Sequence, residues 1–202
     1  MIKIINYGLG NIKAFYNIYQ SKGIDCEICD TPQSLYDAKK LILPGVGSFD
    51  WAMHKLNNSG MRSILDKLVL DEKVPILGIC VGMQIMAEKS EEGKEKGLNW
   101  IEGENIHLSN QNPIKLNFPH MGWNNIQCKD NSLFKDINDP CFYFLHSYHI
   151  KLNDENLAEG YTNYGKNFIC AISKNQRIFG VQFHPEKSHK WGVKLLENFS
   201  NL

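Results

Sequence analysis

The stretch VPILGICVGMQ, residues 74–84, decides the fold. Its first half, 74–79, is an apolar run typical of a buried strand, and helical spacing is predicted over 82–90. Cys80 lies at the junction, with a glycine two positions before it and another two positions after it. Because glycine lacks the Cβ atom that a sharp turn would crowd, this G-x-C-x-G pattern is typical of a nucleophile elbow. The stretch therefore predicts a strand, a strained turn that holds a thiol, and a helix whose positive end favours the thiolate.

Outward from this stretch, the first half of the chain alternates short apolar runs with helical patterns. Strands are predicted over 2–7, 24–29, 41–45 and 74–79, and helices over 11–23, 34–40, 50–56, 61–72 and 82–90. Such alternation indicates a mostly parallel sheet with helices on both faces.

The second half is rich in β-forming residues. Runs at 104–108, 124–128, 141–150, 167–172 and 177–183 are predicted to be mostly antiparallel strands that extend the sheet, before a closing helix at 189–199. The charged run at 88–97 is interpreted as a solvated helix end and loop. No Pro/Gly/Ser-rich linker divides the chain, so we expect a single α/β domain over 1–202.

Composition excludes several classes of protein. The 22 basic and 22 acidic residues cancel, which leaves no excess charge to attract nucleic acid or an anionic membrane. No stretch approaches the ~20 apolar residues of a transmembrane helix, and the first apolar segment is too short for a signal peptide. We therefore expect a cytoplasmic protein in which the six cysteines are reduced.

Cys26 and Cys29 form a C-x-x-C pair, which in other contexts marks a redox or metal site. Here the segment alternates like a strand and no second pair exists, so both thiols are interpreted as packing residues. The sequence assigns no role to Cys128, Cys141 or Cys170.

A partner base for Cys80 lies far downstream. The run at 177–183 ends just before His184, and Pro185 stops strand pairing. Glu186 lies two residues beyond His184, and in an extended segment both would point the same way. Cys80, His184 and Glu186 thus form a candidate nucleophile, base and orienting carboxylate.

Six motifs together carry a family resemblance: NYGLGNI (6–12), PGVGSF (44–49), GICVGMQ (78–84), PHMGWN (119–124), YFLHSY (143–148) and GVQFHPEKS (180–188). With them the whole chain resembles the triad-type (class I) glutamine amidotransferases, in particular the glutaminase subunits that serve imidazole glycerol phosphate synthesis. The resemblance implies the family's three-layer fold, no cofactor, and hydrolysis of glutamine to glutamate and ammonia.

The resemblance also implies roles for further residues. Backbone N–H groups of Val46 and Val81 would form the oxyanion hole. The residues expected to bind glutamine are Gly45, Gly47, Gln84, Ser147 and Tyr148, and those expected to face a partner are Asn11, Trp123 and Lys187.

The partner implied by the resemblance is a separate (β/α)₈ synthase subunit that forms a heterodimer with this chain and receives its ammonia. The acceptor step would belong to histidine biosynthesis. A sugar amidotransferase of surface-polysaccharide or amidino-sugar synthesis is the alternative acceptor enzyme, because forms such as SHKWG (188–192) also occur in those relatives.

Two other sites are rejected on spacing. GLGN (8–11) lacks the G-x-G-x-x-G pattern of a dinucleotide loop. His120, His146 and His149 lack a convincing pattern of metal ligands, so no metal site is predicted.

Overall fold

The computed structural model describes residues 1–111, 116–129 and 133–202, and its centre is a nine-stranded sheet. Five neighbouring strands run parallel, in the order β2 (Cys26–Cys29), β1 (Ile2–Ile5), β3 (Lys40–Gly45), β4 (Ile76–Cys80) and β12 (Ile178–Val181). The sheet continues antiparallel through β11 (Lys166–Lys174), β10 (Ala158–Tyr164), β7 (His120–Cys128) and β8 (Cys141–His146).

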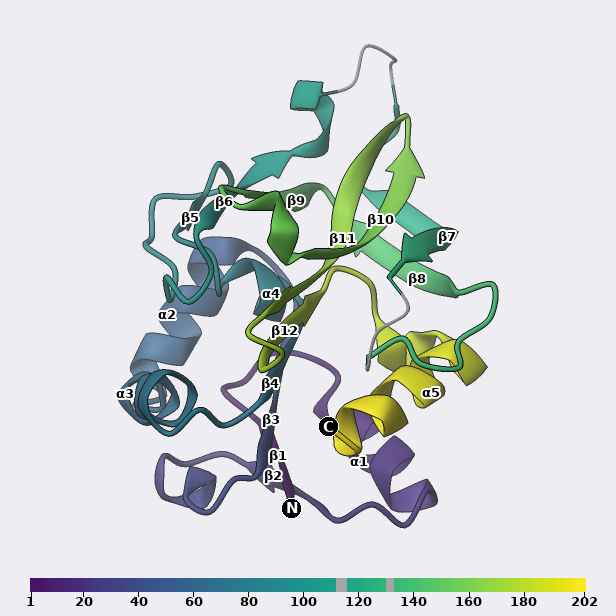
Figure 1. Cartoon of the computed structure of the whole chain (residues 1–202). Helices are drawn as coiled ribbons and strands as arrows, with labels where there is room; N and C mark the ends of the chain where they lie inside the picture. The colour runs from purple at the N-terminus through teal and green to yellow at the C-terminus, as the bar shows by residue number, and fades with distance from the viewer. Residues whose placement is uncertain (112–115, 130–132) are drawn as a thin grey trace.

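Helices cover both faces of the parallel half (Figure 1). On one side lie α1 (Ile12–Ser21) and α5 (His189–Ser200), and on the other α2 (Phe49–Asn58) and α3 (Arg62–Asp66). A π-helical turn (Lys67–Asp71) prolongs α3, and single 3₁₀ turns occur at Gln33–Leu35, Leu108–Gln111, Glu155–Leu157 and Pro185–Lys187. The predicted three-layer α/β fold with an antiparallel extension is confirmed.

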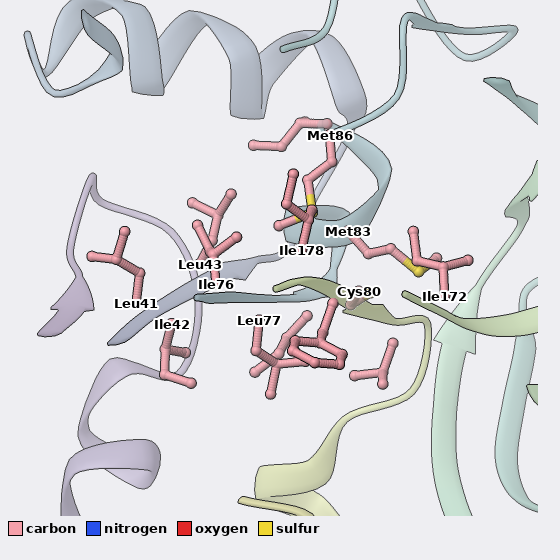
Figure 2. Packing of buried hydrophobic residues seen from close by; sticks show 14 of the residues in the cluster. Leu41, Ile42, Leu43, Ile76, Leu77, Cys80, Met83, Met86, Ile172 and Ile178 are labelled. Carbon is pink, nitrogen blue, oxygen red and sulfur yellow. The ribbon is translucent and has the colours of Figure 1, made fainter. Parts of the chain in front are cut away.

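The core lies on both faces of β3, β4 and β12, which carry almost only buried apolar side chains. In Figure 2, Met86 lies on one side of these strands and Ile42 and Leu77 on the other, all of them fully buried. Burying one such side chain contributes roughly 1.5–3 kcal/mol. The strand that ends in Cys80 is therefore held rigidly from both faces.

The segment after Cys80 is a shorter helix than predicted. The α-helix α4 covers only Val81–Gln84, and the chain then turns into β5 (Lys89–Ser90). The Gly97 N–H donates a hydrogen bond to the Glu88 carbonyl, and the Leu98 N–H donates one to the Ile85 carbonyl. These bonds replace the hydrogen bonds that a continued helix would make. Hydrogen bonding to a distant segment therefore overrides the helical spacing of the sequence. The helix dipole expected to act on the thiol comes from a single helical turn.

A second, three-stranded sheet was not predicted. It contains β5, β6 (Gly103–His107) and β9 (Tyr148–Leu152). The run 141–150, predicted as one strand, breaks at Ser147, so that β8 joins the large sheet and β9 the small one. This break places Ser147 and Tyr148 at the junction of the two sheets.

Three further strand and helix predictions are corrected. β12 pairs parallel with β4 and antiparallel with β11, so it is not purely part of the antiparallel extension. β10 was missed because its polar sequence AEGYTNY lacks a strong strand signal. The predicted helix at 34–40 is a single 3₁₀ turn that ends before Tyr36, whose backbone is extended, and Asp37 beyond it has φ 65°, a left-handed conformation that a helix cannot contain.

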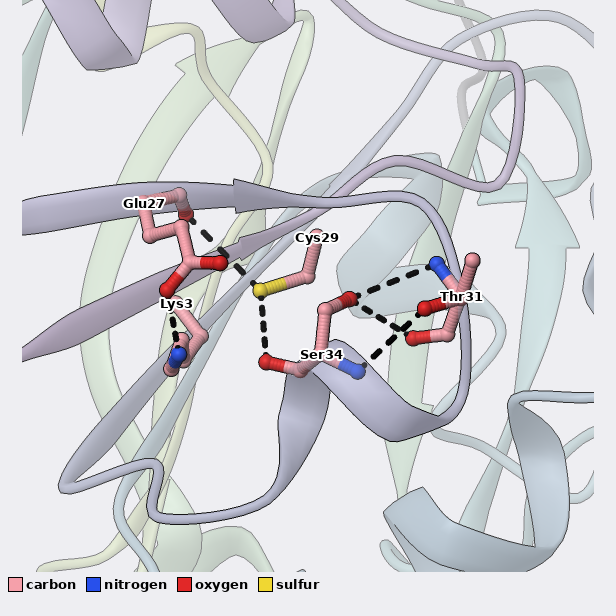
Figure 3. Close-up of polar contacts among 5 residues, drawn as sticks. All are labelled: Lys3, Glu27, Cys29, Thr31 and Ser34. Atoms are coloured by element: carbon pink, nitrogen blue, oxygen red, sulfur yellow. Dashed lines mark hydrogen bonds and ion pairs between the residues drawn. The ribbon is translucent and has the colours of Figure 1, made fainter.

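The C-x-x-C pair lies in β2, and Figure 3 shows its second member, Cys29. Residues i and i+3 of a strand point to opposite faces, and none of the six cysteines, all within the described residues, forms a disulfide. Cys29 donates to the Ser34 carbonyl at 3.1 Å, beside the Lys3–Glu27 ion pair. Both thiols are buried, which confirms the packing interpretation.

Within the described part of the chain, the structure contains no helix with the length and apolar character needed to span a membrane.

Candidate active site

Cys80 ends β4 in a strained backbone conformation, with φ 55° and ψ −114°. The two flanking glycines make this possible. A Cβ on Gly78 would lie 2.6 Å from Met86 Cε, and one on Gly82 would lie 1.9 Å from the Leu43 carbonyl oxygen. The predicted strained turn is thus confirmed, and it presents the sulfur beyond the carboxyl end of the parallel strands.

His184 is held from several sides. Its backbone N–H donates to the Tyr143 carbonyl at 2.9 Å, and the Ser188 hydroxyl donates to its carbonyl at 2.5 Å. Its Nδ1 lies 2.9 Å from Glu186 Oε1, and the Cys80 sulfur lies near enough to act on the charge of the ring. The three residues proposed as a triad are therefore brought together, since His184 is bonded to Glu186 and lines the same cavity as Cys80.

The reason for the Glu186 contact differs from the prediction. Glu186 belongs to the 3₁₀ turn Pro185–Lys187 and not to an extended strand. The turn bends the carboxylate back onto His184, and its side chain is only 2% exposed.

The charge state of His184 follows from its neighbours. Burial alone would lower the pKa of His184, but the hydrogen bond and charge of Cys80, followed by those of Glu186, raise that pKa to about 10. The arrangement therefore favours an imidazolium at His184, which is a proton donor next to the proposed nucleophile.

A cavity of about 310 Å³ opens at this thiol. The predicted site residues that line it are Val46, Gly47, Cys80, Val81, Gln84, Ser147, Tyr148, His184 and Lys187. The structure thus brings together most of the predicted nucleophile, oxyanion and substrate-binding residues at one concave site.

Gly45 lies behind the cavity wall and does not line it. It is the register partner of Cys80, and a Cβ there would lie 2.3 Å from the Gly82 nitrogen. Its absent side chain therefore lets the PGVG segment approach the elbow, which leaves Val46 and Gly47 at the cavity. Gly47 has φ +92°, which glycine adopts readily.

Of the three predicted interface residues, only Lys187 lines the cavity. Its Nζ lies 5.6 Å from the centre of the Tyr143 ring. Trp123 is 45% exposed and stacks on His189, with ring centroids 5.1 Å apart, so it is not a core residue. Asn11 is exposed at the start of α1, outside the cavity.

Glu92 lines the cavity although 88–97 was interpreted as solvated, and this is a correction. Its Oε2 accepts the Phe49 N–H at 2.7 Å, and burial raises the pKa of its carboxyl. The carboxylate of Asp50 accepts the backbone N–H groups of Lys94 and Glu95, which fixes the loop. Nothing distinguished Glu92 from its charged neighbours in the sequence, because its position depends on these hydrogen bonds between the loop and α2.

Among the residues described, no cluster of three or more His, Cys, Asp or Glu side chains could hold a metal ion.

Comparison with known proteins gives one consistent result. The family model "Glutamine amidotransferase class-I" matches residues 3–201. The chain is 46% identical to the imidazole glycerol phosphate synthase subunit HisH of Leptospira interrogans and 48% identical to that of Bdellovibrio bacteriovorus, over all of both chains in each case.

Solved structures of similar fold include one described as a glutamine amidotransferase, with TM-score 0.75 and 13% identity. That match covers 100% of this chain and 99% of the other. A structure described as PurLQS from Thermotoga maritima gives TM-score 0.74 at 16% identity and covers 99% and 97%. At these identities the likeness shows the fold alone.

Proposed function

The chain belongs to the class-I glutamine amidotransferase family, and from that premise we propose that it is the glutaminase subunit of an imidazole glycerol phosphate synthase in histidine biosynthesis. The observation that carries the proposal is that His184 lines the same cavity as Cys80 and is hydrogen-bonded to Glu186. The continuous sheet from β2 to β8 supports treating residues 1–202 as one domain.

In the proposed reaction, the Cys80 thiolate attacks the side-chain carbonyl carbon of glutamine, and the carbonyl electrons move to oxygen. When this oxyanion collapses, the C–N bond breaks and the His184 imidazolium gives its proton to the departing ammonia. A water molecule then attacks the thioester while His184 takes its proton. The C–S bond breaks, glutamate leaves and the thiolate is restored.

Glu186 keeps Nδ1 of His184 occupied, so that the other ring nitrogen faces the reaction. The backbone N–H groups of Val81 and Val46 are proposed to stabilise the oxyanion. Val46 follows Gly45 and precedes Gly47, and these glycines make reorientation of its peptide sterically easy. We infer that this reorientation accompanies binding of the partner subunit.

Glutamine recognition is proposed to use the polar groups that line the cavity. The half-buried carboxylate of Glu92 suits the α-ammonium group, since a charge-assisted hydrogen bond in a partly buried site is strong. Gln84, Ser147 and Tyr148 line the same space and would bind the remaining polar groups.

As the glutaminase subunit of such a synthase, this chain would work with a partner subunit. We propose that the partner is a (β/α)₈ barrel that receives the ammonia, and that Asn11, Trp123 and Lys187 face it. Exposed Trp123 has the chemistry of an interface anchor, and the exposed cation of Lys187 can pair with an acidic group on the partner.

The experiment measures ammonia release from glutamine by the chain alone and in its complex with the acceptor and the synthase subunit. We expect weak activity alone, strong activity in the complex, and loss of both in Cys80→Ser with the complex still assembled. Turnover that survives Cys80→Ser would refute the nucleophile. The same assay with a sugar amidotransferase tests the rival acceptor, and stimulation by that enzyme alone would overturn the histidine assignment.

A further inference from the structure

Gln182 is fully buried between β12 and His184, and the mechanism above gives it no task. We propose that Gln182 is a positioning residue that holds a hydrogen-bond donor on the Cys80 sulfur, in an orientation imposed by Gln84 and the Tyr148 carbonyl. This inference rests on the proposed function only in treating Cys80 as the nucleophile.

The strand register brings Gln182 to the nucleophile. β12 and β4 pair in parallel up to Val181 and Ile79, so the next position on each strand places Gln182 beside Cys80. The backbone N–H of Gln182 donates to the Cys170 carbonyl at 2.9 Å, which fixes its main chain. Gln182 does not line the cavity, so it lies behind the sulfur and away from substrate.

The orientation of the Gln84 amide is fixed first. A backbone carbonyl can only accept, and Gln84 Nε2 lies 2.9 Å from the Tyr148 carbonyl oxygen. The nitrogen of Gln84 must therefore face Tyr148. The same nitrogen lies 3.1 Å from Gln182 Oε1, which uses its second hydrogen.

The orientation of Gln182 follows from that of Gln84. Because its oxygen accepts from Gln84, its Nε2 faces Cys80 Sγ, at the long distance of 3.8 Å. A flipped amide would oppose two NH₂ groups and would turn an oxygen toward the sulfur. The Gln182 donor therefore faces the sulfur, and the Leu145 carbonyl lies 3.9 Å from that sulfur as an acceptor for the thiol.

The Tyr148 carbonyl is itself held by a second donor. His146 Nδ1 lies 2.8 Å from it, and His146 Nε2 lies 3.0 Å from His120 Nδ1. Burial and the neighbouring His120 lower the pKa of His146, so its ring is neutral and carries one N–H, directed at Tyr148. His120 then donates to His146, and both acceptor positions of the Tyr148 carbonyl are filled.

The test is the pH profile of iodoacetamide alkylation at Cys80, followed by mass spectrometry of the Cys80 peptide in the full chain. Gln182→Met keeps the volume and removes the donor, and we expect the alkylation midpoint to rise by about half to one pH unit. Gln182→Glu keeps the acceptor for Gln84 and places a carboxylate at the sulfur, and we expect a larger rise.

The matched control is Gln20→Met. Exposed Gln20 makes the same type of contact with a different cysteine, because its Nε2 lies 3.6 Å from Cys26 Sγ. The Gln20→Met variant should therefore leave the alkylation profile of Cys80 unchanged. A Cys80 profile in Gln182→Met, or in Gln182→Glu if the first variant does not fold, that superimposes on wild type would overturn the inference. Alkylation needs no glutamine, so the two ideas can fail separately. If the profile shifts in Gln182→Met but the wild-type complex does not hydrolyse glutamine, the proposed function is wrong and this inference stands.

Discussion

At the scale of single residues, Glu186 determines how firmly His184 keeps its proton. Glu186→Gln preserves an acceptor for Nδ1 but removes the charge that helps to raise the pKa of His184 to about 10. The pKa of His184 then falls, and the imidazolium is lost at lower pH. We expect the alkaline limb of the kcat/KM profile to move down by about one to two pH units in the assembled complex.

The control for that shift is Glu72→Gln, which removes a carboxylate from an exposed pair with Lys67. It should leave the profile unchanged. An alkaline limb that stays in place in Glu186→Gln would contradict the role given to this carboxylate.

Glu92 is the second residue whose charge can be tested. Glu92→Gln should raise KM for glutamine by about tenfold to a hundredfold, with a smaller effect on kcat, because a charge-assisted bond contributes about 1.5–3 kcal/mol. The steady-state rates are compared with those for the analogue of glutamine that lacks the α-amino group. If Glu92 binds the ammonium, KM for the analogue should not change, and an equal rise for both substrates would exclude that role.

At the scale of elements, β3 packs so closely against the elbow that Gly82 has no room for a side chain. Gly82→Ala would bring a Cβ to 1.9 Å from the Leu43 carbonyl oxygen, which is backbone and cannot move alone. We expect the free energy of unfolding in urea to fall by at least about 3 kcal/mol.

Gly23→Ala provides the comparison. Gly23 has φ +66°, and no atom lies within 4 Å of the place that a Cβ would occupy, so only the left-handed backbone is penalised, by about 1 kcal/mol. Equal losses in the two variants would show that the close approach of β3 to the elbow is not the cause.

The elements also show what the sequence could and could not predict. The elbow and the pairing of His184 with Glu186 follow from residues close together in the chain, and these were predicted. The shortened helix after Cys80 depends on backbone hydrogen bonds to residues 97–103. The place of Glu92 depends on the hydrogen bonds that the Asp50 carboxylate accepts from the backbone of the loop. Such long-range partners leave no periodic signal, so local spacing predicted a helix and a solvated loop instead.

At the scale of the whole molecule, three buried imidazoles in the antiparallel half tie stability to pH. Burial lowers the pKa of His120 and of His149 to about 4, and that of His146 well below its usual value. Since the unfolded chain binds these protons near pH 6.5 and the folded chain does not, the free energy of unfolding should fall as pH drops from about 6.5 toward 4.

Urea unfolding at about pH 7, 5.5 and 4.5 measures this slope. His149→Gln removes one buried titrating ring and should make the slope shallower, whereas His54→Gln on the exposed face of α2 should not. Identical slopes in wild type and His149→Gln would contradict the prediction.

The position of β12 between β4 and β11 has a consequence for biosynthesis. Proteins are made from the N-terminus, so the ribosome releases the thiol about one hundred residues before the ring that activates it. A nascent or prematurely terminated chain that stops before β12 lacks both the strand that pairs with β4 and the base His184, so we expect it to release no ammonia from glutamine.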